Sequence, residues 1–291
     1  MEEILRRVKI VKETNNDFLK NLNMKLQECI ESIPLNTTDA MRYSLGAGGK
    51  RVRPLLVRAS CLDCGIKDDS FWEPAIAVEL FHTASLIHDD LPPIDDSSTR
   101  RGKPSCHIKY GQDLAILAGD GLMLKSFEVL SKSQLESDNL IRLLKVFSDA
   151  VYRVLLGEAM DVEALPHMNA KQITQVYKYK TGALFSFCLS VGPIMISNMK
   201  LFEKTIKLGE TIGIWFQLLD DLKDATLTEK ETGKTVGRDS LLNRPTLLKI
   251  VGLERAQLLA DNLYRAVIKA LRRERMINSA NIIEELGKVG A

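Results

Sequence analysis

The stretch WEPAIAVELFHTASLIHDD, residues 72–90, has apolar residues three and four positions apart. It shows none of the alternation of apolar and polar residues that is typical of a strand. This spacing predicts a helix with a buried face. The same spacing recurs over residues 113–131, 140–163, 206–223 and 253–275. The segment 206–223 is apolar nearly all round until its acidic end, which predicts a deeply buried helix. The sequence therefore predicts an all-α fold.

Short breaks separate the predicted helices, at residues 46–49, 92–104 and 229–246. None has the composition of an interdomain linker, and the chain has no internal repeat or low-complexity tract. A hydrophobic fraction of 45% over 291 residues is enough for a sizeable core. We therefore expect residues 1–291 to form a single large helical domain.

The overall charge and the cysteines narrow the function classes. A formal net charge of +2 creates no field that favours nucleic acid or an anionic membrane. No apolar run reaches the roughly 18 residues of a transmembrane segment, and the start, MEEILRRVKIVKE, lacks the apolar core of a secretory signal. The five cysteines include one C-x-x-C pair, without the second pair that a structural zinc site requires. We expect a cytoplasmic protein with reduced thiols and no nucleic-acid partner.

An acidic cluster follows the first of these helices, in LIHDDLPPIDDSSTRRGKP, residues 86–104. Four acids packed together repel one another unless cations neutralise them, and carboxylates are oxygen ligands that suit Mg²⁺. The bases just downstream argue against a merely solvated acidic loop, because a Mg²⁺–diphosphate complex needs acids and bases together. The acids are Asp89, Asp90, Asp95 and Asp96, and the bases are Arg100, Arg101 and Lys103.

A second acidic cluster ends the apolar segment IGIWFQLLDDLKD, residues 212–224. Asp220 and Asp224 are four residues apart and share one helix face with Gln217. Two acids at this spacing could form a surface face by chance. The residues before them are too apolar for a solvated helix, so these acids are expected to meet a cavity, a cation or water.

The glycine-rich stretch GAGGKRVRP, residues 46–54, is the third candidate. Glycines let the backbone approach an anion closely, and the cations Lys50, Arg51 and Arg53 offer charge-assisted bonds to phosphate oxygens. Two smaller features fit the same chemistry. His82 lies on roughly the same helix face as Asp89, although a lone histidine there is more often a core residue. Lys180 interrupts an apolar stretch and either extends to solvent or enters the same cavity.

These residues together resemble the trans-type (head-to-tail) polyprenyl diphosphate synthases. The match runs from about residue 48 to about residue 255, and both aspartate motifs stand in the family's order and context, which is highly specific. The matching segments are GGKRVRP, FHTASLIHDDLPPIDDSSTRRGKPS, LAGDGLMLKSFEVL, YKYKTGAL, FQLLDDLKD and TGKTVGRD. The resemblance implies a helical bundle of the isoprenoid synthase type around a central active-site cavity, and a homodimer.

The resemblance also implies a reaction. An allylic diphosphate ionises to a carbocation, the double bond of isopentenyl diphosphate attacks it, and loss of a proton gives an allylic diphosphate longer by one isoprene unit. Three Mg²⁺ ions would be held by the aspartates Asp89, Asp90, Asp95, Asp220, Asp221 and Asp224. The implied isopentenyl diphosphate site consists of Lys50, Arg53, His82 and Arg101. Arg100, Lys180 and Lys234 would bind the allylic diphosphate, and Thr181 and Gln217 would lie near the developing cation.

Some positions depart from the family's pattern. Ser97-Ser98-Thr99 stand where further acids are frequent, outside the three predicted metal ligands of that motif. Glu158 stands where a glutamine is usual. Arg238 and Arg244 stand where lysines are common, which preserves the charge but changes its geometry. The C-terminal NIIEELGKVGA does not clearly match the family's usual ending.

Product length is predicted from the helix that precedes Asp89. In the family that the chain resembles, the growing product runs down this helix, and an aromatic residue one turn before the first aspartate acts as a floor that stops growth near C15. Here Ala84 and Ser85 stand at that level. Both side chains are small, so Phe81, about one turn further down, is the predicted floor. A turn rises about 5.4 Å, close to the length of one isoprene unit. The open level at Ala84 and the predicted floor at Phe81 favour C20 geranylgeranyl diphosphate as the product. Pro92-Pro93 within the acidic motif also resembles the bacterial geranylgeranyl-forming type. C15 farnesyl diphosphate is the alternative if another helix sets the floor.

Three other classes of protein fit these residues less well. A terpene cyclase needs no second diphosphate site. In this chain, GGKRVRP and His82 look like such a second site. A non-catalytic synthase subunit would be expected to lose acids, whereas both motifs are complete. A structural helical protein leaves the coincident basic and glycine clusters without an explanation.

Overall fold

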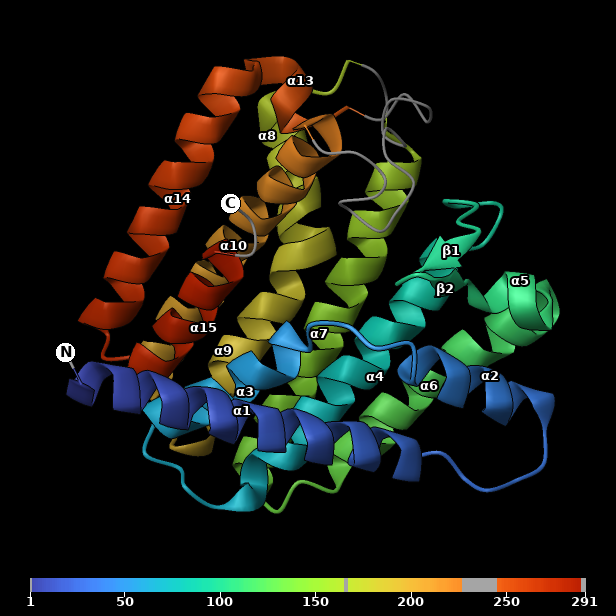
Figure 1. Cartoon of the computed structure of the whole chain (residues 1–291), viewed down its shortest axis with the longest axis horizontal. Helices are drawn as coiled ribbons and strands as arrows, with labels where there is room; N and C mark the ends of the chain where they lie inside the picture. The colour runs from blue at the N-terminus through green and yellow to red at the C-terminus, as the bar shows by residue number, and fades with distance from the viewer. Residues whose placement is uncertain (1, 165–166, 227–244, 289–291) are drawn as a thin grey trace. The chain divides into compact units, whose positions relative to one another are not determined.

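The computed structural model describes residues 2–164, 167–226 and 245–288, with side chains from residue 15 onward (Figure 1). Apart from one two-stranded sheet, every regular element in these residues is helical, so the all-α prediction is confirmed. The chain divides into two compact units that alternate along the sequence. The first consists of Met1–Arg51 and Ile76–Lys132, and the second of Val52–Ala75 and Ser133–Ala291. The single domain over residues 1–291 stays a prediction.

The first unit contains most of the predicted helix 72–90 and the whole of helix 113–131. Its element α2 packs against α1, α5 and α6. The helices are α1 (Glu2–Glu28), α2 (Asn36–Leu45), α4 (Trp72–Asp89, from Ile76 onward), α5 (Cys106–Tyr110) and α6 (Gln112–Ser131). The strands β1 (Thr99–Arg100) and β2 (Lys103–Pro104) form a hairpin inside the break predicted at residues 92–104.

The second unit is built around α9 (Ala183–Met195), whose residues from Ala183 to Ile194 are all buried. A helix that is apolar all round has no face to present to water, and α9 packs against α3, α7, α10 and η2. The unit's other helices are α3 (Val52–Asp63), η1 (Asp69–Phe71), α7 (Ser137–Val162), α8 (Ala170–Tyr177), η2 (Lys178–Gly182), α10 (Met199–Thr226), α13 (Leu247–Val251), α14 (Leu253–Arg273) and α15 (Ile277–Lys288).

The helix predicted over residues 206–223 is α10, which begins earlier and ends slightly later than predicted. Its face with Ile212, Trp215 and Leu218 is fully buried, and the helix packs against α9 and α14. Apart from Lys207, residues 206–224 are buried or half-buried. The helix predicted to be deeply buried is therefore buried along one face and half-buried over most of the rest, and it carries acids at its end.

The C-terminal segment whose match to the family was unclear forms α15, which packs against α3 and α14 (Figure 1). The carboxylate of Asp63, at the end of α3, accepts hydrogen bonds from the backbone N–H groups of Asn278 (2.8 Å) and Ser279 (2.9 Å). These bonds satisfy donors that the first turn of a helix leaves without a partner.

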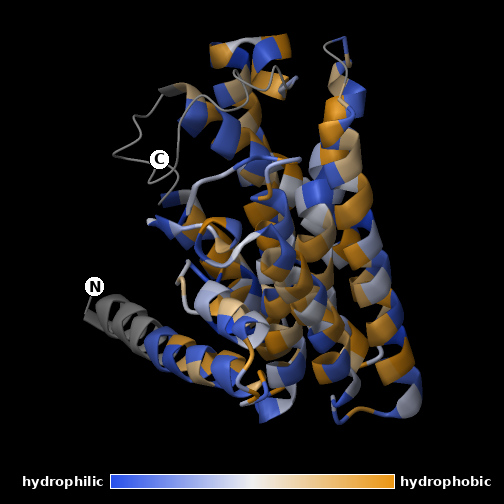
Figure 2. Ribbon diagram, turned by 90° about the vertical axis from the view of Figure 1, so that its right-hand side faces the viewer, coloured by the Kyte–Doolittle hydropathy of each residue, from blue (hydrophilic) through white to orange (hydrophobic). Residues whose placement is uncertain are grey.

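The helices carry bands of hydrophilic and hydrophobic residues, as helices with one buried face do (Figure 2). Among the helices in the described residues, none combines the length and the hydropathy needed to span a bilayer.

Candidate active site

The first acidic motif folds back onto the end of α4. The Asp95 N–H donates to the carbonyl oxygen of Asp89 (2.9 Å), and the Ser97 N–H donates to that of Asp90 (3.0 Å). Asp96 takes the left-handed conformation that closes this loop, with φ of 48°. Asp89 and Asp95 are thus neighbours through their backbones, although they are six positions apart in the chain.

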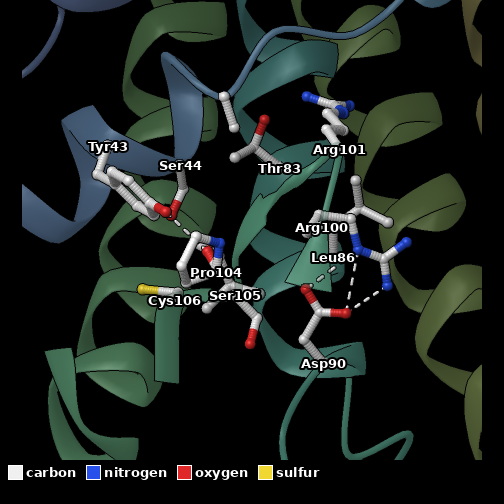
Figure 3. Close-up of a pocket in the computed structure, with 12 residues that line it drawn as sticks. Tyr43, Ser44, Thr83, Leu86, Asp90, Arg100, Arg101, Pro104, Ser105 and Cys106 are labelled. Atoms are coloured by element: carbon white, nitrogen blue, oxygen red, sulfur yellow. Dashed lines mark hydrogen bonds and ion pairs between the residues drawn. The ribbon is translucent and has the colours of Figure 1, made fainter. Parts of the chain in front are cut away.

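Asp90 is almost fully buried, with 2% of its surface exposed, and Arg100 holds its carboxylate. The Nε of Arg100 donates to both carboxylate oxygens, at 3.0 and 3.1 Å, and its Nη2 donates to Oδ1 (Figure 3). Burial raises the pKa of Asp90, and the guanidinium offsets this rise only in part. The pair lines a pocket together with Tyr43, Thr83 and Arg101.

The hairpin β1–β2 places Arg100 and Arg101 at its turn. Thr99 pairs with Pro104 and Arg100 with Lys103, so Arg101 and Gly102 form a two-residue turn with φ of 54° and 74°. The Arg101 guanidinium donates to the carbonyl oxygen of Gly48. A side chain at Gly49 would collide with that guanidinium. The hairpin therefore brings Arg101 onto the glycine-rich loop, two predicted site elements that lie 53 residues apart.

The three cations of GGKRVRP have different surroundings. Lys50 is exposed. Arg51 is buried, where its Nη1 contacts the Glu79 carboxylate at 2.5 Å. Arg53, which belongs to the second unit, stacks on the Phe185 ring at 5.2 Å. Arg51 therefore supports the fold of the first unit, and it is the one cation of this stretch that the implied isopentenyl diphosphate site leaves out.

The predicted product-length residues lie along α4. Phe81 and Ala84 are buried, and Ser85 is half-buried. The Ser85 hydroxyl donates to the carbonyl oxygen of His82 at 3.0 Å, within the same helix. Since Phe81, Ser85 and Asp89 follow one another at four-residue spacing, they form one stripe along the helix.

In the second unit, the acids at the end of α10 have two different environments. Asp220 and Asp224 are half-buried and share one helix face. Asp221 has only 4% of its surface exposed, and its Oδ2 accepts a hydrogen bond from the Tyr177 hydroxyl. Gln217, one turn earlier, accepts a hydrogen bond from the Thr181 hydroxyl at 3.1 Å. The structure thus joins Thr181 and Gln217, the two residues predicted to lie near the developing cation.

Lys180 lies in η2, a single π-helical turn, a feature often found at functional sites. Its Nζ contacts Glu158 at 2.8 Å and Asp161 at 2.6 Å, both on α7. Gly157 leaves room for the Lys180 backbone, which a side chain there would strike. Glu158, singled out only as a departure from the family's pattern, is therefore a direct partner of a predicted diphosphate-binding lysine.

Sequence reasoning missed Tyr177 and Asp161. Asp161 stands three residues after Glu158, so their shared helix face was a signal for a joint partner. Tyr177 gave no local signal, because its two polar contacts come from residues 44 and 70 positions away. The predicted site residue Lys234 and the departures Arg238 and Arg244 lie outside the described residues.

The donor set fits Mg²⁺. Among the described residues, no three His, Cys, Asp or Glu side chains form a cluster that would hold a metal by protein ligands alone. Mg²⁺ usually binds one or two carboxylates and completes its shell with waters and substrate phosphates. Asp89 and Asp95 of the first unit, and Asp220 and Asp224 of the second, provide such carboxylates in two small sets.

The fold and the paired aspartate motifs place the chain in the class of helical isoprenoid synthases. Geranylgeranyl pyrophosphate synthase 11, chloroplastic, of Arabidopsis thaliana is 37% identical over 261 residues, with 86% of this chain and 72% of that protein covered. Farnesyl diphosphate synthase of Haemophilus influenzae is 35% identical over 253 residues, with 84% and 86% covered.

A solved structure gives the same result. The crystal structure of geranyltransferase from Helicobacter pylori, complexed with magnesium and isoprenyl diphosphate, has a TM-score of 0.81 at 31% identity. The match covers 94% of this chain and 97% of that one. Residues 35–285 match the polyprenyl synthetase family. The chain belongs to this family.

Proposed function

We propose that the protein is a Mg²⁺-dependent trans-polyprenyl diphosphate synthase. It condenses isopentenyl diphosphate with an allylic diphosphate (dimethylallyl, geranyl or farnesyl) head to tail, and its product is geranylgeranyl diphosphate. The observation that carries this proposal is the match to the polyprenyl synthetase family over residues 35–285, within which both aspartate motifs are complete.

The described residues have distinct roles in this reaction. Arg100 and Lys180 bind the allylic diphosphate, the leaving group whose C–O bond breaks. Thr181 and Gln217, already joined by a hydrogen bond, direct oxygen dipoles toward the allylic cation. Bound Mg²⁺ supplies positive charge that stabilises the departing diphosphate. Three ions would be held by Asp89, Asp90, Asp95, Asp220, Asp221 and Asp224.

The activity is tested by incubating purified protein with isopentenyl diphosphate, each allylic diphosphate in turn, and MgCl₂. An elongated diphosphate is expected. A hydrocarbon or alcohol would identify a terpene cyclase instead. No turnover with any primer would point to a non-catalytic subunit and contradict the proposal.

The two diphosphate sites are separated by substitution. Lys50→Ala and His82→Ala are expected to raise the KM for isopentenyl diphosphate about 10- to 100-fold. Lys180→Ala is expected to raise the KM for the allylic substrate by a similar factor. A hydrogen bond to a charged group is worth about 1.5–3 kcal/mol, which corresponds to these factors. Arg53→Ala is expected to behave like Lys50→Ala. Steady-state kinetics with each substrate varied provides the measurement, and equal effects of all four variants on both constants would contradict the assignment.

Product length is a further prediction, measured by chromatography of the dephosphorylated products. Ala84→Tyr is expected to shift the product towards C15, because an aromatic ring one turn before Asp89 blocks the growing chain. Phe81→Ala is expected to lengthen it beyond C20, because it removes the proposed floor. Ser85→Ala, which deletes only a hydroxyl bonded within α4, is the control. A C15 product from the wild type, or no change in either variant, would show that another residue sets the length.

The protein is further proposed to act as a homodimer in the cytoplasm. Large apolar side chains are exposed on α6 and on α7, each a surface that a second copy can cover. They are Ile116, Leu117 and Leu124 on α6, and Ile141, Tyr152 and Leu155 on α7. All five cysteines, each among the described residues, are free thiols, which fits a reducing compartment.

A further inference from the structure

The Tyr177 hydroxyl is a point where three helices of the second unit meet. Tyr177 ends α8 and has 5% of its surface exposed. Its hydroxyl donates to Oδ2 of Asp221 on α10, and it accepts the backbone N–H of Leu247, the first residue of α13, at 3.1 Å. The helices α8, α10 and α13 pack against one another around it (Figure 1).

This arrangement restricts the Asp221 carboxylate. A phenol has one proton to donate, and here that proton goes to a carboxylate with 4% of its surface exposed. A hydrogen bond to an ionised acceptor is stronger and shorter than one between neutral groups. Oδ2 of Asp221 is therefore directed at Tyr177, which fixes the side chain's rotation, while the neighbouring Asp220 and Asp224 share a different, half-buried face.

The same hydroxyl contacts the start of α13. Thr246 caps that helix through its own hydroxyl, which accepts the Lys249 N–H at 3.2 Å. The N–H of Leu247, the residue directly after Thr246, is another donor that the first turn of a helix leaves without an internal partner. Tyr177 accepts it, so a single side chain links the acidic end of α10 to the first turn of α13.

We propose that Tyr177 is a positioning residue for the second acidic motif, and that its hydroxyl sets the affinity of that motif for Mg²⁺–diphosphate. The proposal rests on the proposed function, because it needs Asp220, Asp221 and Asp224 to serve as the metal-binding acids. Partners that orient a metal's ligands from the outside typically change metal affinity or activity by about 10- to 100-fold when they are removed.

Tyr177→Phe tests the proposal, because it removes one oxygen and keeps the ring in place. The Mg²⁺ concentration that gives half-maximal rate is expected to rise about 10-fold, with the KM for isopentenyl diphosphate unchanged. A second readout needs no turnover. The rise in Tm that MgCl₂ and inorganic diphosphate cause together in the wild type is expected to shrink, since the stabilisation from a bound ligand falls with its affinity.

Two further variants separate positioning from a merely structural role. Tyr179→Phe makes the same change two residues away, where the ring lies near Arg153, and is expected to leave the Mg²⁺ dependence unaltered. In an Asp221→Asn background, Tyr177→Phe is expected to add little, because the two groups act through one bond.

The outcomes separate the two proposals. If the wild type is active and Tyr177→Phe keeps its Mg²⁺ dependence and its ligand-induced Tm shift, the positioning role is wrong and the synthase proposal is unaffected. A lower Tm with unchanged Mg²⁺ dependence would equally refute the positioning role, because it would show that the bond serves only the fold. Absence of synthase activity in the wild type would instead overturn the proposed function.

Discussion

Asp89→Ala and Asp220→Ala are each expected to lower kcat/KM by at least about 100-fold, since removing one preorganised electrostatic group from an active site typically costs 10²–10³ in rate. Each carboxylate is a proposed Mg²⁺ ligand, and neither is fully buried in its unit, so the fold is expected to survive. Steady-state kinetics at saturating MgCl₂ measures the loss, and helical circular dichroism verifies that the fold is intact.

Matched controls exist in both units. Asp96→Asn changes an exposed acid in the same loop as Asp89, but at a position outside the three proposed ligands. Glu203→Ala removes an exposed acid from α10, well before its acidic end. Both controls are expected to retain the wild-type rate. Near-wild-type turnover in Asp89→Ala or Asp220→Ala would contradict a mechanism that uses both clusters.

The helices and the two acidic motifs could be predicted from the sequence because both depend on local patterns. The helices α4, α6, α7, α10 and α14 all agree with the three-and-four spacing of apolar residues. Four acids after a strongly apolar helix are an anomaly visible in a single segment. In the structure, Asp90 of this cluster and Asp221 of the second cluster are buried and hydrogen-bonded to polar partners.

The partners of these acids could not be predicted, because they come from distant parts of the chain. Tyr177 reaches Asp221 across 44 residues. Lys180 lies in a π-helical turn and contacts Glu158 and Asp161 of α7. The hairpin at Arg101 is set by two residues with positive φ, only one of which is a glycine. Spacing rules assume regular helices and contain none of this information.

The three neighbouring cations of GGKRVRP also have partners that could not be predicted from the sequence. Their composition alone makes Lys50, Arg51 and Arg53 equivalent candidates for binding phosphate, and only the resemblance to the family leaves Arg51 out. In the structure, Arg51 is 4% exposed and Glu79 only 1%. Besides the ion pair, the Arg51 guanidinium donates to the carbonyl oxygen of Leu45 at 2.5 Å and to the side chain of Asn23 at 3.2 Å. Arg51 therefore holds the end of α2 against a buried acid of α4.

Arg51→Leu is accordingly expected to cost about 3–5 kcal/mol of unfolding free energy, the usual effect of removing one partner of a buried ion pair and leaving the other charge without compensation. Equilibrium denaturation in urea measures it. Lys50→Ala, one residue away but exposed, is the matched control and is expected to leave stability within about 0.5 kcal/mol of wild type. Glu79→Leu alone is expected to destabilise for the same reason as Arg51→Leu.

The double variant Arg51→Leu/Glu79→Leu distinguishes this cause from lost packing. Replacing a buried ion pair by apolar residues of similar size is often neutral, so the double variant is expected to recover part of the loss. Recovery is incomplete because the Leu45 carbonyl and Asn23 still lose a donor. If the two single losses simply add, the residues do not act as a pair. If Arg51→Leu retains wild-type stability but loses affinity for isopentenyl diphosphate, Arg51 belongs with Lys50 among the phosphate-binding cations, and its contact with Glu79 contributes little to the fold.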